Sequence, residues 1–574
     1  MTTRRFVLCA LAVALTANLA ACGSKKKDKR KRAVPEPATE SDRQGGHLKL
    51  HSNEPQYLNP VLQTRFERVN MLIYEGLVGL DARLEPVARL AASWDISESG
   101  KVIKFNLRKD VSWHDGTPFT ARDVKFTYDA IRKVEQPTLW KAYFESVDSV
   151  EIIDDHTVVV VYDKPYALAL VAWTVGIIPM HKFEAYLPAN APGDAPIAGT
   201  VAPAADAGTG APPAKSLADA PSNREPVGTG PFRIARWEPG ARVVLNANTK
   251  WWYGRPYLDT VEVLTNIADE DLVESLRTGK IDFAQITDVQ AWINEAQLPE
   301  FQERFEVKDV VVPGFQVIAW NMTRDTFGKQ KVRQALTHAL NRGRVIDDVL
   351  MAQARPISAP FFANMYGADP SIAPHAFDLD KAVKLLDEAG HKSKDGRRFD
   401  IELMATESSK GPTTDGILAL FRHDLAAIGI GLKVSYVTAE QFDQKMIMRD
   451  FDAAYFGWLP DVPDPDPYAL LHSSQIRFGS VHAGYANPEV DRLLDEARAT
   501  TDKDERKALY NKVHAIVHVE LPYTPLFAAY GHYAYSRRLH GVNPNDAGAE
   551  PRFPGIARWW IGPEPASHVA KPIP

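Results

Sequence analysis

The chain has 574 residues, of which 45% are hydrophobic and 24% are charged, and its formal net charge is −6. This length is enough for two or more domains, and this apolar content supports complete hydrophobic cores. The acidic balance argues against nucleic acid as a partner, although the basic run KKKDKRKR occupies 25–32. Cys9 and Cys22 are the two cysteines, so the chain after residue 22 has none for a disulfide, a thiolate nucleophile or a zinc site.

The first 21 residues have the pattern of an export signal. Arg4 and Arg5 precede a mostly apolar run at 6–19, which is too short to span a bilayer. The run ends in Leu-Ala-Ala-Cys, which resembles a bacterial lipobox, so Cys22 is expected to carry the lipid of the mature protein. We therefore expect a signal peptide at 1–21, a lipidated flexible tether at 22–45, and an exported chain held in the periplasm or on the outer face of the cell membrane. An ordinary cleavage site with an incidental cysteine is the alternative.

Alternating and capped segments predict the first secondary structure elements. Residues 47–51 alternate and predict a strand, and SNEPQYLNP at 52–60 predicts a loop. Residues 102–108 alternate as a half-buried strand, while Thr120 followed by Asp123 predicts the capped start of a helix. The Ala, Pro and Gly-rich stretch at 188–221 can bury little apolar surface and predicts a surface insertion.

Three motifs suggest chemistry, but each is better explained by structure. His114 and Asp115 lie in the turn sequence HDGTP, and the glycines at 228–230 lack the Lys-Ser/Thr of a phosphate loop. His514 and His518 are spaced i, i+4, but no third ligand follows from the sequence, so a helix face is expected. With no serine elbow, metal triad or paired acid and base, we expect neither an enzyme nor a cofactor or metal site.

The second half alternates helices and strands, which indicates an α/β arrangement. A strand is predicted at 310–322, and an amphipathic helix with an apolar stripe is predicted at 331–350. Further helices and strands are predicted at 380–390, 399–404, 415–428, 432–437 and 502–519.

The stretch DAAYFGWLPDVPDPDP at 452–467 combines an aromatic strand with an acidic loop. Gly457 allows close approach of another group, and the four prolines after Trp458 prevent the strand from continuing. A carboxylate held beside an aromatic wall suits a cationic or amino group. A solvated acidic turn is the alternative.

Several segments in a fixed order resemble one protein family. The segment GW followed by an acidic, Pro-containing loop, the Trp–strand–HDGTPF–helix string at 90–131, and the Gly- and Trp-rich string at 226–259 resemble the dipeptide- and oligopeptide-binding lipoproteins of peptide ABC transporters, solute-binding protein family 5. The resemblance covers residues 46–545.

The resemblance implies an α/β, two-lobed periplasmic-binding-protein fold of type II-like, family 5 architecture, with an extra subdomain on the first lobe. The implied divisions are lobe I at 46–80, the extra subdomain at 81–225 containing the insertion 188–221, the second part of lobe I at 226–312, lobe II at 313–521, and the return to lobe I with the C-terminal tail at 522–574.

The resemblance also implies a ligand site between the lobes. In the family, the third residue after the Trp is an Asp that pairs with the α-ammonium of the peptide; here it is Asp461, with Asp464 and Asp466 as rivals if the register slips. Oligopeptide receptors have an Arg three residues before the Trp, whereas this chain has Tyr455, so the partner of a peptide carboxylate is unplaced. The expected ligand-binding residues are Asp461, Trp458, Gly457, Tyr455, Tyr57, Trp320 and Asn321, of which the last three are expected at the cleft edge.

We therefore expect a monomeric substrate-binding lipoprotein that delivers short peptides to the permease subunits of an ABC importer. The same fold with a non-peptide ligand, such as a metal chelate, haem or a sugar, is one alternative. A surface adhesin or chaperone-like lipoprotein is another.

Overall fold

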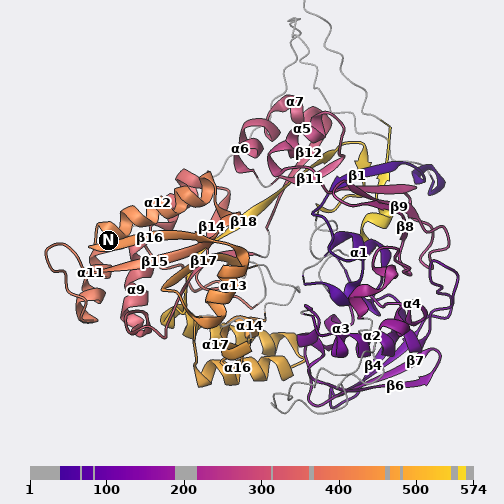
Figure 1. The fold of residues 1–574 in the computed structure, drawn as a ribbon, viewed down its shortest axis with the longest axis horizontal. Helices are drawn as coiled ribbons and strands as arrows, with labels where there is room; N and C mark the ends of the chain where they lie inside the picture. The colour runs from indigo at the N-terminus through magenta and orange to yellow at the C-terminus, as the bar shows by residue number, and fades with distance from the viewer. Residues whose placement is uncertain are drawn as a thin grey trace, which may run out of the picture.

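The computed structural model describes residues 39–64, 67–81, 85–136, 138–187, 216–286, 288–311, 314–360, 367–458, 466–478, 483–544 and 554–563. The molecule consists of two lobes joined along one long sheet, with a smaller helical group beside the junction (Figure 1). The first lobe holds the N-terminal strand and a separate four-stranded sheet, and the second holds most of the helices after residue 320.

Twelve strands form the long sheet, whose main path has the order β16-β15-β17-β13-β18-β11-β1-β10-β9-β8, with β12 and β14 also paired to β18. The separate sheet of the extra subdomain has the order β4-β5-β7-β6 and is antiparallel throughout. The strands are β1 (His47–His51), β2 (Val78–Leu80), β3 (Pro86–Ala88), β4 (Ala91–Ile96), β5 (Val102–Leu107), β6 (Val147–Asp154), β7 (Thr157–Tyr162), β8 (Phe232–Glu238), β9 (Arg242–Ala247), β10 (Thr260–Leu264), β11 (Phe283–Ile286), β12 (Phe305–Val311), β13 (Phe315–Trp320), β14 (Ala354–Pro356), β15 (Phe399–Thr406), β16 (Ile430–Val437), β17 (Ala453–Trp458), β18 (Tyr523–Ser536), β19 (Leu539–His540) and β20 (Trp560–Ile561).

Helices cover both faces of the sheet in the second lobe, and further helices pack around the strands of the first lobe (Figure 1). They are α1 (Arg68–Ile73), α2 (Ala121–Lys133), α3 (Ala169–Ala172), α4 (Met180–Phe183), α5 (Leu272–Arg277), α6 (Val289–Ala291), α7 (Pro299–Arg304), α8 (Asp325–Gly328), α9 (Gln330–Ala339), α10 (Arg342–Arg344), α11 (Leu379–Glu388), α12 (Pro412–Ala426), α13 (Ala439–Met448), α14 (Tyr468–Leu471), α15 (Gln475–Phe478), α16 (Pro488–Ala499) and α17 (Lys503–Glu520).

Strand β18 carries the chain from one lobe to the other. Its first half pairs with β13, and its second half pairs with β11 and β12. Phe527 and Ala528 lie in the cores of the second lobe, whereas Tyr533 and Tyr535 lie in the core of the first. The chain thus passes from the cores of the second lobe to the core of the first within β18.

Two buried cores lie on opposite faces of the second lobe's sheet. Along β13, Ile318 and Trp320 belong to one core, while Val317 and Ala319 belong to the other. This alternation follows from the two-residue period of a strand. It also fixes which side chains share a face where β13 and β17 pair.

A buried carboxylate joins the extra subdomain to the first lobe. Glu75 accepts hydrogen bonds from Arg89 Nη2 at 3.0 Å, Thr229 Oγ1 at 3.1 Å and Trp252 Nε1 at 3.1 Å. A fully buried carboxylate is tolerated when it is paired and hydrogen-bonded in this way.

His114 has a structural role, as the sequence predicted. Its Nε2 lies 3.0 Å from the carbonyl oxygen of Gly230, and its Nδ1 accepts the Gly228 N–H at 3.2 Å. A Cβ at Gly228 would stand 1.8 Å from the Ile73 carbonyl oxygen. The glycines at 228–230 therefore serve close backbone packing against the end of α1, and not a phosphate group.

The structure confirms several predicted elements and corrects two. The strand at 47–51 is β1, and Thr120 with Asp123 forms the predicted capping box at the start of α2. The single helix expected at 331–350 is wrong: α9 ends at Ala339, Leu340 is extended, and the Asn341 side chain caps a new turn. The single strand expected at 310–322 is two strands, β12 and β13, which belong to different parts of the sheet. Residues 188–215 of the predicted insertion lie outside the described residues, and Leu217 after them is buried in the first core.

Candidate functional site

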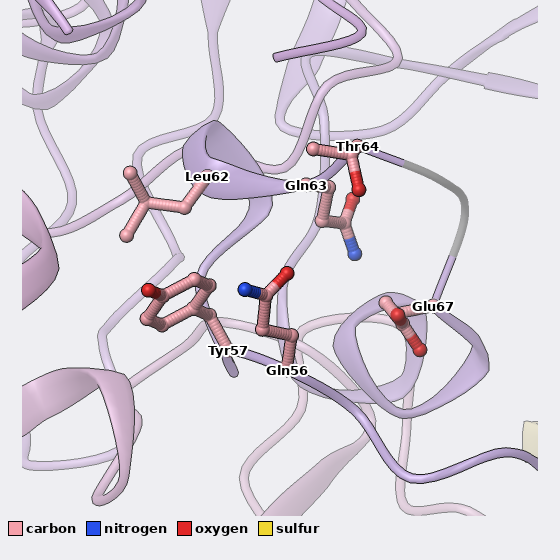
Figure 2. Close-up of a pocket in the computed structure, with 6 residues that line it drawn as sticks. All are labelled: Gln56, Tyr57, Leu62, Gln63, Thr64 and Glu67. Carbon is pink, nitrogen blue, oxygen red and sulfur yellow. The ribbon is translucent and has the colours of Figure 1, made fainter. Parts of the chain in front are cut away.

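A polar cavity of about 290 Å³ lies in the first lobe, beside the loop that follows β1. Its lining residues are Gln56, Tyr57, Leu62, Gln63, Thr64 and Glu67. Figure 2 shows the carboxamides of Gln56 and Gln63 pointing toward each other across the cavity, with the Glu67 carboxylate at one side. The helix α1 that follows this loop lies on the side of its lobe that is turned toward the other lobe (Figure 1).

The Asn59 side chain anchors the loop that lines the cavity. Asn59 Oδ1 accepts the Val61 N–H at 2.9 Å and starts a 3₁₀ turn at Pro60–Leu62, while Asn59 Nδ2 donates to Asn223 Oδ1 at 2.9 Å. Pro60 suits the first position of such a turn, because its missing N–H would have no partner there. Both polar atoms of the Asn59 side chain therefore have partners within the protein.

Gln63, which follows this turn, differs from Asn59 because one polar atom of its side chain has no partner among the described residues. Its side chain is buried, and its Nε2 makes no hydrogen bond with any residue that the structure describes. A buried donor without a partner costs free energy, which a ligand acceptor in the cavity would recover. Nothing in the sequence distinguished Gln63 from other glutamines, so sequence reasoning missed it. Tyr57, by contrast, was predicted and does line the cavity.

The second candidate region is the end of the β13–β17 pair in the second lobe. Phe315 pairs with Trp458, Gln316 with Gly457, and Ile318 with Tyr455. Gly457 and Tyr455 are therefore on one face of the sheet. Trp458 is on the other face, where it packs against the core that contains Val317 and Ala319.

Gly457 allows the side chain of Gln316 to lie across the strand. A Cβ at residue 457 would stand 2.6 Å from Gln316 Nε2. Gln316 Oε1 is buried and accepts no hydrogen bond from the described residues. The close approach that Gly457 was expected to permit thus exists, but the partner is Gln316, which sequence reasoning did not identify.

Three of the predicted ligand-binding residues are committed to the fold. Trp320 is buried, its Nε1 donates to Thr524 Oγ1 at 2.9 Å, and its ring stacks on Phe327. Asn321 is fully buried and donates from Nδ2 to the carbonyl oxygens of Arg449 and Phe451, each at 2.7 Å. These positions do not support the expected placement of Trp320 and Asn321 at the cleft edge.

Tyr455 is also buried, at 6% exposure, in the same core as Trp320. Burial raises the pKa of Tyr455, because the charged phenolate is disfavoured away from water. The side chain therefore supplies neither a cation nor an exposed hydroxyl to a ligand in this structure.

Of the acidic residues after Trp458, the structure describes Asp466. Its carboxylate, 5% exposed, accepts the Arg498 Nε–H at 2.7 Å and the Tyr468 N–H at 3.0 Å. Asp461 and Asp464 lie outside the described residues, as does Cys22. The structure thus brings together Tyr57 with the cavity and Gly457 with Gln316, and it gives Asp466 an internal partner.

His514 and His518 lie on α17 as expected, and they bond within the protein. His514 Nε2 donates to Ser358 Oγ at 3.0 Å, and its Nδ1 accepts the Asp369 N–H at 3.0 Å. His518 Nδ1 donates to the Ser358 carbonyl oxygen at 2.8 Å. Across the described ranges, His, Cys, Asp and Glu form no group of three or more that could hold a metal ion. In the same ranges, no helix is long and apolar enough to cross a membrane.

Comparisons with known proteins place these features in a family. The chain matches the family model of bacterial extracellular solute-binding proteins, family 5 Middle, over residues 85–479. It is 28% identical to the oligopeptide-binding protein AppA of Bacillus subtilis, with 97% of each chain covered. It is also 28% identical to heme-binding protein A of Haemophilus influenzae, with 92% of this chain and 95% of that protein covered.

A solved structure agrees with the fold. AppA from Bacillus subtilis in complex with a nonapeptide superimposes with a TM-score of 0.72 at 25% identity, over 91% of this chain and all of that one. The family model alone spans more than half of the chain, and the two-lobed fold with its extra subdomain agrees with it. The chain belongs to the bacterial extracellular solute-binding proteins of family 5.

Proposed function

We propose that this chain binds short peptides between its lobes and delivers them to the permease of an ABC importer. The observation that carries the proposal is its similarity, over 97% of both chains, to an oligopeptide-binding protein. The polar cavity of about 290 Å³ suits such a ligand, because hydrated polar pockets accept side chains of different kinds. Gln63 Nε2 would donate to a peptide carbonyl or to a polar side chain of the ligand.

Within this proposal, Asp461 pairs with the α-ammonium of the peptide and Trp458 walls the site. Asp466 is the weaker candidate, because its carboxylate is already paired with Arg498 at 2.7 Å. A cleft that closes on the ligand would remove water from both charges. Loss of one partner of such a pair costs about 3–5 kcal/mol, which corresponds to a loss of affinity of several hundredfold or more.

Native mass spectrometry of the exported chain with short peptides and their N-acetylated twins tests this proposal. We expect free peptides to bind, acetylated peptides to bind weakly, and Asp461→Asn to abolish the difference. Asp464→Asn is the matched control, since it removes the same charge three residues away and should bind like the unmodified chain. Equal binding of free and acetylated peptides would remove Asp461 from its role, and loss only in Asp464→Asn would show that the register has slipped.

A non-peptide ligand is the second candidate, favoured by the similarity of this chain to a heme-binding protein over 92% of its length. The buried Tyr455, at the position where oligopeptide receptors have an Arg, also leaves a peptide carboxylate without a proposed cation. Mass spectrometry of whatever small molecule copurifies with the chain separates the two candidates. A copurifying haem or metal chelate, with no peptide bound, would replace the peptide proposal.

We also propose that Cys22 carries the lipid that anchors the chain outside the cytoplasm, and that the chain acts as a monomer. The support is the signal-like segment before Cys22 and the lipobox-like sequence at 19–22. Partition of the chain into detergent, with Cys22→Ser as the control, is the measurement. Retention of Cys22→Ser in the detergent phase would count against the anchor.

A further inference from the structure

The two lobes also touch far from β18, where the end of α16 meets the turn before α3 (Figure 1). The backbone N–H of Ala167 in the first lobe donates to the carbonyl oxygen of Arg498 in the second at 2.7 Å. Arg498 lies in the last turn of α16, where helix carbonyls have no intrahelical partner. The interlobe bond thus satisfies a group that the helix itself leaves open.

The side chain of Arg498 fixes the second-lobe half of this contact. Its Nε donates to Asp466 Oδ2 at 2.7 Å, and its guanidinium lies 3.5 Å from the centre of the Tyr468 ring. Burial lowers the pKa of Arg498, but the nearby Asp466 carboxylate more than offsets this, so the pKa is raised overall and the guanidinium stays charged. One side chain therefore ties the end of α16 to the start of α14.

A second contact accompanies the first. Lys503 at the start of α17 pairs with Glu85 of the first lobe, with both side chains about half exposed. Exposed pairs of this kind contribute little to stability. The desolvated contact at Arg498 is therefore the one expected to matter.

We infer that the turn at 166–169 and the end of α16 form a latch that holds the lobes closed, with Arg498 as its positioning residue. The inference rests on the proposed function, because a latch that favours closure retains the ligand. It acts on the dissociation rate, since the ligand must wait for the latch to open before it leaves. It also favours the closed form of the ligand-free chain.

The latch can be removed without changing a side chain that faces the ligand. Ala169 N–H donates to the Tyr166 carbonyl at 3.0 Å, so Ala167 is the second residue of a turn, a position that accepts proline. Ala167→Pro deletes the interlobe donor, and Ala167→Gly keeps it as the matched control. Arg498→Met removes the positioning side chain while keeping the backbone carbonyl.

Distance measurements between two labels report the latch directly. The chain after Cys22 has no cysteine, so spin labels would attach at the two introduced cysteines, Glu98→Cys in the first lobe and Lys507→Cys in α17. We expect Ala167→Pro and Arg498→Met to shift the distance distribution of the ligand-free chain to longer values than in Ala167→Gly. For bound peptide, we expect the dissociation rate constant to rise about threefold to tenfold with an unchanged association rate constant.

Identical distance distributions in Ala167→Pro and Ala167→Gly would overturn the latch. A lower association rate constant in Ala167→Pro, with no rise in the dissociation rate constant, would overturn it as well. Failure of every peptide to bind would count against the proposed function alone, because the ligand-free distances still report the latch.

Discussion

The two candidate regions, one in each lobe, combine bonded and open polar groups in different ways. The first-lobe cavity leaves a polar group open, since Gln63 Nε2 has no hydrogen-bond partner among the described residues, whereas its frame residue Asn59 is satisfied. In the second-lobe region, Asn321 and Asp466, which the sequence suggested, are bonded within the protein, while Gln316 Oε1, which it did not suggest, accepts no hydrogen bond from the described residues. The comparison teaches that polar or aromatic residues at strand ends do not by themselves mark a binding site. Polar groups without an internal partner are the better guide.

Truncating the two tryptophans gives the largest test of this comparison. Trp320 fills a core and bonds Thr524, so Trp320→Ala should lower the free energy of unfolding by about 3–5 kcal/mol. Trp458 is half-buried at the strand end, so Trp458→Ala should cost less stability and weaken ligand binding more. Urea unfolding and calorimetric titration of the folded variants measure the two effects. A stable Trp320→Ala chain with lost affinity would reverse the assignment of roles.

Acidification is expected to destabilise both lobes through one histidine in each. His114 in the first lobe and His514 in the second each accept a backbone N–H at Nδ1, a bond that protonation would break. The pKa of each is lowered to about 4, mainly by burial, and for His514 the nearby His518 contributes to the lowering. Unfolded histidine takes up its proton near pH 6.5. The stability that these two neutral histidines contribute is therefore complete above pH 6.5, and it is lost as the pH drops toward about 4.

We expect this fall to be on the order of 2 kcal/mol per histidine. Thermal unfolding followed from pH 7 to pH 4 measures it. His514→Gln should reduce the dependence on pH, and replacement of the exposed His423 should leave it unchanged. A profile that is flat between pH 6.5 and pH 4 would contradict the expectation.

Local patterns in the sequence were sufficient for β1, β5 and the capped start of α2, because each depends on neighbouring residues. The helix expected at 331–350 failed because Asn341 caps a new turn, a choice that its bond to Asp424 supports. Gln316 could not be predicted, since its position over Gly457 depends on the register of two strands far apart in sequence. In the same way, the pairing of Asp466 could not be predicted, because its partner Arg498 lies 32 residues away in the sequence.

Replacing Gln63 sharpens the first-lobe side of the comparison. Gln63→Leu removes the buried donor while keeping most of the volume, so stability should be unchanged or slightly higher. If a ligand acceptor uses Nε2, affinity should fall about tenfold, the loss expected for one buried hydrogen bond. Gln297→Leu, on an exposed position, is the matched control. Unchanged affinity in calorimetric titration would show that the cavity does not bind the ligand through Gln63.

Gly457→Ala has the smallest expected effect and tests the second-lobe side. The new methyl group would meet Gln316 Nε2 at 2.6 Å, so the carboxamide must move, but it is the end of a flexible side chain. Stability should therefore change by less than about 1 kcal/mol. Affinity should fall about threefold if Gln316 contacts the ligand, and Gly457→Ala combined with Gln316→Ala should then be no weaker than Gln316→Ala alone. Additive losses would mean that Gly457 and Gln316 contribute independently, with the ligand meeting the backbone at Gly457 directly.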